Sequence, residues 1–216
     1  GDEERALRLT LRLVKEPGGG AAARLEAGEL FMQLGRLESA AEAWSGALVL
    51  SPRDDDLRFR LAALYQRLDR HLDEEQLLTT LVRESLEQAH VLRAGKRLVQ
   101  LAISHDRLEP LERVLVPLVA YGGRRREIHL RLLTSVYAAM THRMRWSTDS
   151  AEDLRVLGER ALNPLIDALS VQDVSMRSQA LDVLELTRSP GSVPALARLL
   201  EQADASARLR AASILG

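Results

Sequence analysis

The chain of 216 residues is 46% apolar but only 3% aromatic, carries a net charge of −1 and contains no cysteine. The lack of cysteine excludes disulfides, thiolate metal sites and cysteine nucleophiles, and the balanced charge offers no general attraction to polyanions. No run of about 18 apolar residues occurs, so we expect no membrane insertion. We expect a bacterial chain in the cytoplasm, with the periplasm as the alternative, because arginine greatly outnumbers lysine and the absence of cysteine suits both compartments.

Residues 3–16 place Ala6, Leu9 and Leu13 on one stripe, which predicts an amphipathic helix. Pro17 and the three glycines after it should end this helix. We interpret the segment as the second half of an earlier repeat, and the whole chain as a piece of a longer protein.

Residues 21–54 have small, aromatic and proline residues at the spacing expected of a 34-residue helix pair. Small residues let two helices cross closely, aromatic residues fill the space beside the crossing, and a proline ends the second helix. The matching positions are Ala21, Gly28, Phe31, Gly35, Ala40, Trp44, Ala47 and Pro52. At these positions the segment resembles a tetratricopeptide repeat, with Arg24 as the one departure, at the family's tryptophan position.

A second unit at 55–88 matches less well. It keeps Leu61, Ala62 and Tyr65 as packing residues, but Glu74 stands where a small residue belongs. The expected core of this unit is therefore imperfect.

A third unit is placed at 92–123, because Asp106-Arg107-Leu108 repeats the pattern of Gly35-Arg36-Leu37. This spacing is longer than in the first two units, so we expect a longer turn around 85–91. Pro110 suits the first turn of a helix, whereas Pro117 should kink or shorten that helix.

Residues 124–148 form a basic segment, with six arginines and one acid. An amphipathic helix is predicted at 126–146, followed by a polar break in which Ser150 can cap the next helix. The arginines are candidates for binding phosphates or acidic peptide: Arg124, Arg125, Arg126, Arg131, Arg143 and Arg145. The alternative, which we favour, is that they pair with acids on neighbouring units or cap the preceding helix end.

Beyond a short helix predicted at 151–157 and ended by Gly158, the chain repeats with an offset of 31 residues. LNPLIDAL at 162–169 returns as VPALARLL at 193–200, and DVSMRSQALDVL at 173–184 returns as DASARLRAASIL at 204–215. Helices are predicted near 161–170, 174–187, 192–202 and 205–215, with the aspartates at 173 and 204 as N-caps. Arginines one turn later, at 177 and 208, can reach the aspartate of their own unit or that of the neighbouring unit. The segment 151–216 resembles short bacterial HEAT repeats of the phycobilisome-lyase-like group.

These patterns predict an all-α chain, a right-handed α-α superhelix in which tetratricopeptide-like units continue into HEAT-like units. The domains expected are repeats at 1–123, a basic junction at 124–150 and HEAT-like repeats at 151–216. Repeats of such length bury their apolar faces only against their neighbours. Leu209, Ile214 and Leu215 should therefore lie on a face meant for a further repeat.

The tetratricopeptide resemblance implies that the first helix of each unit lines a concave groove. It carries the groove positions over to residues on the first helix of each of the three units, and we select eight of them as the candidate partner-binding site. They are Glu29, Gln33, Phe59, Gln66, Arg67, Arg93, Lys96 and Gln100. A groove of this mixed character suits an extended or helical peptide.

Nothing in the sequence indicates catalysis. The five histidines lack the spacing of helical metal ligands, and the glycines at 18–20 follow no strand, as a phosphate loop would require. We expect no enzyme activity, no cofactor and no metal. The sequence favours a protein-interaction scaffold that binds a peptide or partner protein in its groove. The alternative is binding of nucleic acid or another polyanion through the basic segment at 124–146.

Overall fold

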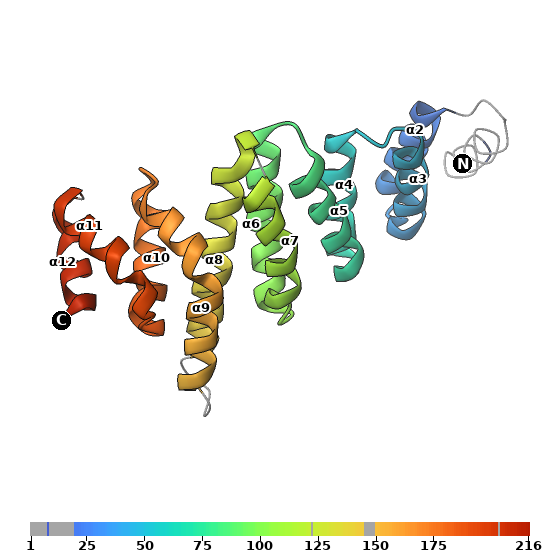
Figure 1. The fold of residues 1–216 in the computed structure, drawn as a ribbon. Helices are drawn as coiled ribbons and strands as arrows, with labels where there is room; N and C mark the ends of the chain where they lie inside the picture. The colour runs from blue at the N-terminus through green and yellow to red at the C-terminus, as the bar shows by residue number, and fades with distance from the viewer. Residues whose placement is uncertain (1–7, 9–19, 122, 145–149, 203) are drawn as a thin grey trace. The chain divides into compact units, whose positions relative to one another are not determined.

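The computed structural model describes residues 8, 20–121, 123–144, 150–202 and 204–216. Every regular element within these ranges is a helix (Figure 1). They belong to two compact units, residues 1–98 and residues 99–216. The predicted helix at 3–16 lies outside the described residues except at Arg8, as do the residues at 17–19.

The first unit contains α2 (Ala21–Gln33), α3 (Leu37–Leu50), α4 (Asp55–Arg67), α5 (His71–Glu84) and the beginning of α6 (Gln88–Ser104). Helix α2 packs on α3, α3 on α4, and α4 on α5. Two large aromatic side chains, Phe31 and Trp44, are buried in the core, among alanines and leucines from α2, α3 and α4. The predicted helix pairs are therefore present.

The turns inside three helix pairs have the same geometry. Gly35, Asp69 and Asp106 each have positive φ, at 71°, 58° and 54°. The amide of the next residue in each turn donates to a carbonyl five residues earlier, over 2.8 to 2.9 Å. This is the hydrogen bond that closes a Schellman helix end. Glycine and aspartate tolerate the left-handed conformation, so the alignment of Asp106 with Gly35 is confirmed in the backbone.

The predicted longer turn at 85–91 is wrong. The connection between α5 and α6 covers only residues 85–87, and α6 is 17 residues long where α2 and α4 have 13. The additional residues of this repeat therefore lengthen its first helix. They add turns to α6, where they form regular backbone hydrogen bonds in place of an extended loop.

The second unit contains α7 (Leu108–Tyr121), the 3₁₀ turn η1 (Gly123–Arg125), α8 (Arg126–Met144), α9 (Ser150–Leu169) and α10 (Val174–Thr187). The 3₁₀ turn η2 (Pro190–Ser192), α11 (Val193–Gln202) and α12 (Ala205–Leu215) follow. Each helix from α7 to α10 packs on the next, and α8 contacts α10, which in turn contacts α12. The packing of neighbouring helices within each unit, with a helix as every regular element of the described residues, confirms the predicted all-α solenoid class.

The predicted helix end at Gly158 is wrong, and Pro117 lies inside a continuous helix. Helix α9 passes through Gly158, which is buried where a Cβ would lie 2.7 Å from Cβ of Thr187 on α10. Glycine is therefore needed for close helix packing here and does not end the helix. Helix α7 likewise runs through Pro117, although proline has no N–H for the carbonyl four residues earlier.

The predicted N-caps in the second unit are confirmed. A carboxylate oxygen of Asp173 accepts from the amide of Met176 over 3.0 Å, and one of Asp204 accepts from the amide of Ala207 over 2.9 Å. Arg177 pairs with Asp204, with Nη1 and Oδ2 2.8 Å apart. One repeat is thereby joined to the cap of the next. On α12, Leu209 is exposed, as expected, whereas Ile214 and Leu215 are half-buried.

Candidate functional site

The eight predicted groove residues lie on the first helices of the pairs, α2, α4 and α6. Phe59 is half-buried, and the other seven are exposed: Glu29, Gln33, Gln66, Arg67, Arg93, Lys96 and Gln100. Their backbone positions are fixed by the buried leucines and alanines on the opposite sides of these helices, among them Leu61 and Ala94. The predicted residues are thus available to a partner.

Contacts at these positions join the three helices into one surface. Glu29 on α2 accepts a hydrogen bond from Arg60 on α4, with Oε1 and Nη1 2.6 Å apart. On the next pair of helices, the Arg93 guanidinium of α6 lies 4.3 Å from the ring centre of Phe59 on α4. Figure 1 shows α2, α4 and α6 in succession along the chain. We call this surface the first-helix face.

The first-helix face has a histidine at its α4–α6 contact that sequence reasoning missed. The His90 ring meets Phe59 edge-on, with the ring centres 5.3 Å apart. Nδ1 of His90 lies 3.4 Å from Oδ2 of Asp55, and Nε2 lies 3.4 Å from Oε2 of Glu87. The sequence around His90 does not indicate this contact, because Phe59 and Asp55 lie 31 and 35 residues earlier.

Asp55 is the anionic centre of that contact. Arg58 donates to its Oδ1 over 2.8 Å. Burial alone would raise the pKa of the Asp55 carboxyl, but hydrogen bonds with Ser85, His90 and Arg58 outweigh it and hold the pKa below its usual value. The carboxylate is therefore charged at neutral pH and fixes the start of α4 against α6.

Two cations on the first-helix face remain available. Lys96 on α6 and Arg67 on α4 make no ion pair with any residue that the structure describes. Lys96 and Gln100 are one helical turn apart on α6 and so lie on one side of that helix. The exposed amides at Gln33 and Gln66 add hydrogen-bond donors and acceptors to the same face.

The basic segment is largely occupied by internal ion pairs. Arg126 donates to Asp167 over 2.6 Å, Arg131 pairs with Asp173, and Arg143 pairs with both Asp106 and Glu109. Arg124 and Arg125 lie on η1 and have interactions of their own. Arg145 lies outside the described residues. For the three arginines on α8, the favoured alternative of pairing with neighbouring acids is confirmed.

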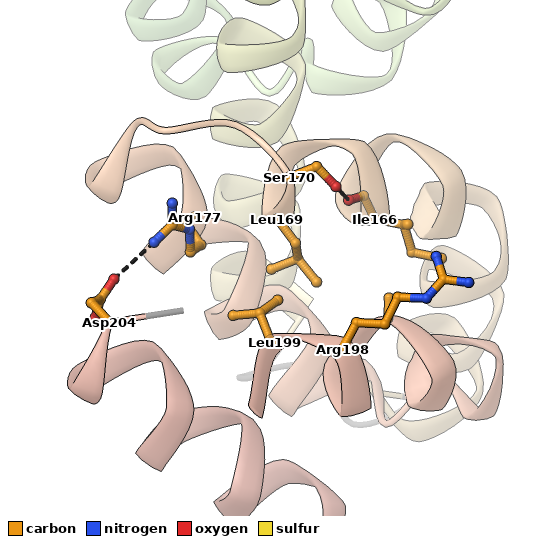
Figure 2. Close-up of a pocket in the computed structure, with 8 residues that line it drawn as sticks. Ile166, Leu169, Ser170, Arg177, Arg198, Leu199 and Asp204 are labelled. Carbon is orange, nitrogen blue, oxygen red and sulfur yellow. Dashed lines mark hydrogen bonds and ion pairs between the residues drawn. The ribbon is translucent and has the colours of Figure 1, made fainter. Parts of the chain in front are cut away.

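The second unit also contains pockets that sequence reasoning did not predict, and two of them have volumes of several hundred Å³. The larger has a volume of about 820 Å³ and is lined by α7, α8 and α9. The smaller, of about 430 Å³, lies among α9, α10 and α11 at the Asp204 cap. Figure 2 shows Leu169 and Leu199 between the Arg177–Asp204 pair and Arg198 in this smaller pocket.

Metal and membrane functions gain no support. No group of histidine, aspartate and glutamate residues within the described ranges is arranged to hold a metal ion. None of the described helices combines the length and apolar character needed to cross a bilayer. Comparison with known protein families, curated proteins and solved structures finds no match.

Proposed function

We propose that this chain is a non-catalytic interaction scaffold that binds an acidic or carboxamide-bearing peptide segment of a partner protein on its first-helix face. In this proposal residues 21–123 are tetratricopeptide-like units and residues 151–216 are HEAT-like units. The observation that carries it is the surface joined by the Glu29–Arg60 and Phe59–Arg93 contacts, on which Lys96 and Arg67 have no ion pair with a described residue.

The chemistry of the face favours a peptide with acidic or amide side chains. Glu29 is neutralised by Arg60, with Oε1 and Nη1 2.6 Å apart. Lys96 and Arg67 then leave local positive charge, flanked by the exposed amides. A charge-assisted hydrogen bond to such a group contributes roughly 1.5–3 kcal/mol before desolvation. Several of these bonds along one face select for an acidic sequence.

Internal pairing argues against the polyanion alternative. Binding of nucleic acid depends on arginines and lysines that neutralise phosphates and release counterions. Arg126, Arg131 and Arg143 would first have to leave their carboxylate partners. That exchange reduces the net gain from each phosphate contact, so the basic segment is better suited to holding α8 against its neighbours.

The test is selection of short random peptides against the full chain, followed by fluorescence polarisation with the selected sequences. We expect acidic sequences, and we expect Lys96→Glu with Gln100→Ala to abolish their binding while the helical circular dichroism is unchanged. The matched control, Arg53→Glu with Gln76→Ala, changes exposed residues away from the first-helix face and should bind normally. Unchanged affinity in the first double variant would contradict the proposal and make the basic segment the leading candidate.

A further inference from the structure

The larger pocket of the second unit has the size and lining of a small-molecule site. Its volume of about 820 Å³ lies within the roughly 300–1,000 Å³ typical of ligand pockets. One wall is apolar and comes mainly from α7, with a contribution from α9: Val116, Pro117, Val119, Ala120 and Pro164. Val116 is 42% exposed, so its side chain is accessible from the pocket. We call this space the α7–α9 pocket.

The acids that line the α7–α9 pocket are all neutralised. Each of the three carboxylates has an arginine partner: Glu109 with Arg143, Glu112 with Arg160, and Asp167 with Arg126. Glu112 is buried, and its Oε1 lies 2.8 Å from Nε of Arg160. A bound cation would therefore find no carboxylate that is free of an arginine in this lining.

Among the arginines that line the pocket, Arg113 is the one that none of these carboxylates neutralises. It lines the pocket from α7, and its Nε donates a hydrogen bond to the Glu109 carbonyl oxygen over 3.4 Å. No carboxylate among the described residues pairs with it. The guanidinium is exposed and can form the two parallel hydrogen bonds that a carboxylate accepts from arginine.

Tyr137 forms the floor of the pocket. It is fully buried, and its hydroxyl lies beside the buried carboxylate of Glu112. Burial, and then the neighbouring Glu112 carboxylate, raise the pKa of this hydroxyl, so it is neutral at physiological pH. Tyr137 therefore adds no second anion to the lining of the pocket.

We propose that the α7–α9 pocket binds a small molecule with an apolar body and a single carboxylate. The apolar body packs on Val116, Pro117, Ala120 and Pro164, and the carboxylate pairs with Arg113. The charge balance of the lining specifies one anionic group, and the apolar wall excludes ligands that are polar throughout. This site is separate from the first-helix face and does not depend on peptide binding there.

Isothermal titration calorimetry of the full chain with decanoate and with 2-naphthoate tests this assignment. We expect saturable binding of at least one of them, weakened about tenfold or more by Arg113→Gln and abolished by Ala120→Trp, which fills the pocket from an exposed position. Decyltrimethylammonium, with a similar apolar body and the opposite charge, should bind far more weakly. Arg53→Gln, an exposed arginine in the first unit, is the matched control and should bind like the unchanged chain.

Three results would overturn the assignment. One is no binding of either carboxylate to the folded chain. Another is equal binding of the cationic probe, which would indicate a general apolar surface. The third is unchanged carboxylate affinity in Ala120→Trp, with its circular dichroism intact, which would place the ligand elsewhere.

Discussion

Arg97 on α6 forms a two-point hydrogen bond with the buried carboxylate of Glu74 on α5. Nε lies 2.6 Å from Oε1, and Nη2 lies 3.2 Å from Oε2. Glu74 is only 1% exposed, at a position where the repeat register predicted a small residue. The pair replaces close packing of small side chains with an ionic bond between two helices of the first unit.

Removing the Arg97 side chain from this pair should strongly destabilise the chain. Arg97→Ala leaves the Glu74 carboxylate buried without its partner, and we expect the free energy of unfolding to fall by about 3 kcal/mol. Glu74→Leu combined with Arg97→Leu should recover most of that loss. Urea unfolding of the single and double variants measures both effects, and a loss for Arg97→Ala no larger than for an ordinary surface substitution would refute the prediction.

Two glycines in the same helix pair should respond oppositely to alanine. A Cβ on Gly28 would lie 2.2 Å from the Trp44 ring, whereas one on Gly46 would meet the flexible end of Arg24. Gly28→Ala should therefore destabilise the chain by about 1–3 kcal/mol through overpacking.

Gly46→Ala is the matched control. Arg24 can move aside, and alanine is favoured over glycine in a helix by up to about 1 kcal/mol. We expect this variant to be neutral or more stable in thermal unfolding. Equal destabilisation by the two substitutions would contradict the close packing of Gly28 against the Trp44 ring at the α2–α3 crossing.

Stability should fall in acid because structural aspartates are held ionised. The hydrogen bond from the Met176 amide, opposed by burial and helped by Arg131, lowers the pKa of Asp173 below 3.8, and the pKa of Asp55 is also lowered. A lowered folded-state pKa stabilises the chain above the unfolded value, and this stabilisation is lost as pH falls through the folded value.

We therefore expect the chain to lose this stabilisation as the pH falls from about 5 to about 2. Asp173→Asn keeps a capping side chain but removes the titration, so the loss of stability with falling pH should become shallower. Asp56→Asn is the control, because Asp56 is exposed and makes no ion pair with a described residue. Identical pH profiles for Asp173→Asn and the unchanged chain would count against the prediction.

The paired arginines predict weak binding of nucleic acid. At physiological salt, duplex DNA should bind no better than the general non-specific level of about 10⁻⁴ M. Asp167→Asn with Asp173→Asn releases Arg126 and Arg131 and should strengthen this binding at low salt. Micromolar binding by the unchanged chain, with a steep salt dependence, would revive the polyanion alternative.

The sequence predicted features that depend on local chemistry. Asp173 and Asp204 are recognisable as caps because a cap bonds to an amide three residues away. Asp106 aligns with Gly35 because the same Arg-Leu pair follows each of them. Gly158 was misread as a helix end, because its reason is the approach of Thr187, 29 residues later. Local composition does not encode such a contact.

Of the two candidate sites, the sequence predicts one and does not predict the other. The exposed positions of the first-helix face follow from helix periodicity and the repeat register, so they could be selected from the sequence. The α7–α9 pocket could not, because its charge balance depends on pairs such as Glu112–Arg160, which join residues 48 positions apart. Partner choice among many acids and arginines is decided by tertiary packing.

Photo-crosslinking tests the peptide-binding claim most directly. A photoreactive p-benzoylphenylalanine is placed at position 66 on α4 or, as the matched control, at position 76 on α5, where a glutamine is also exposed. A bound acidic peptide should crosslink from position 66 and not from position 76, and excess unlabelled peptide should suppress the product. Crosslinking from position 76 without crosslinking from position 66 would show that the peptide does not bind the first-helix face.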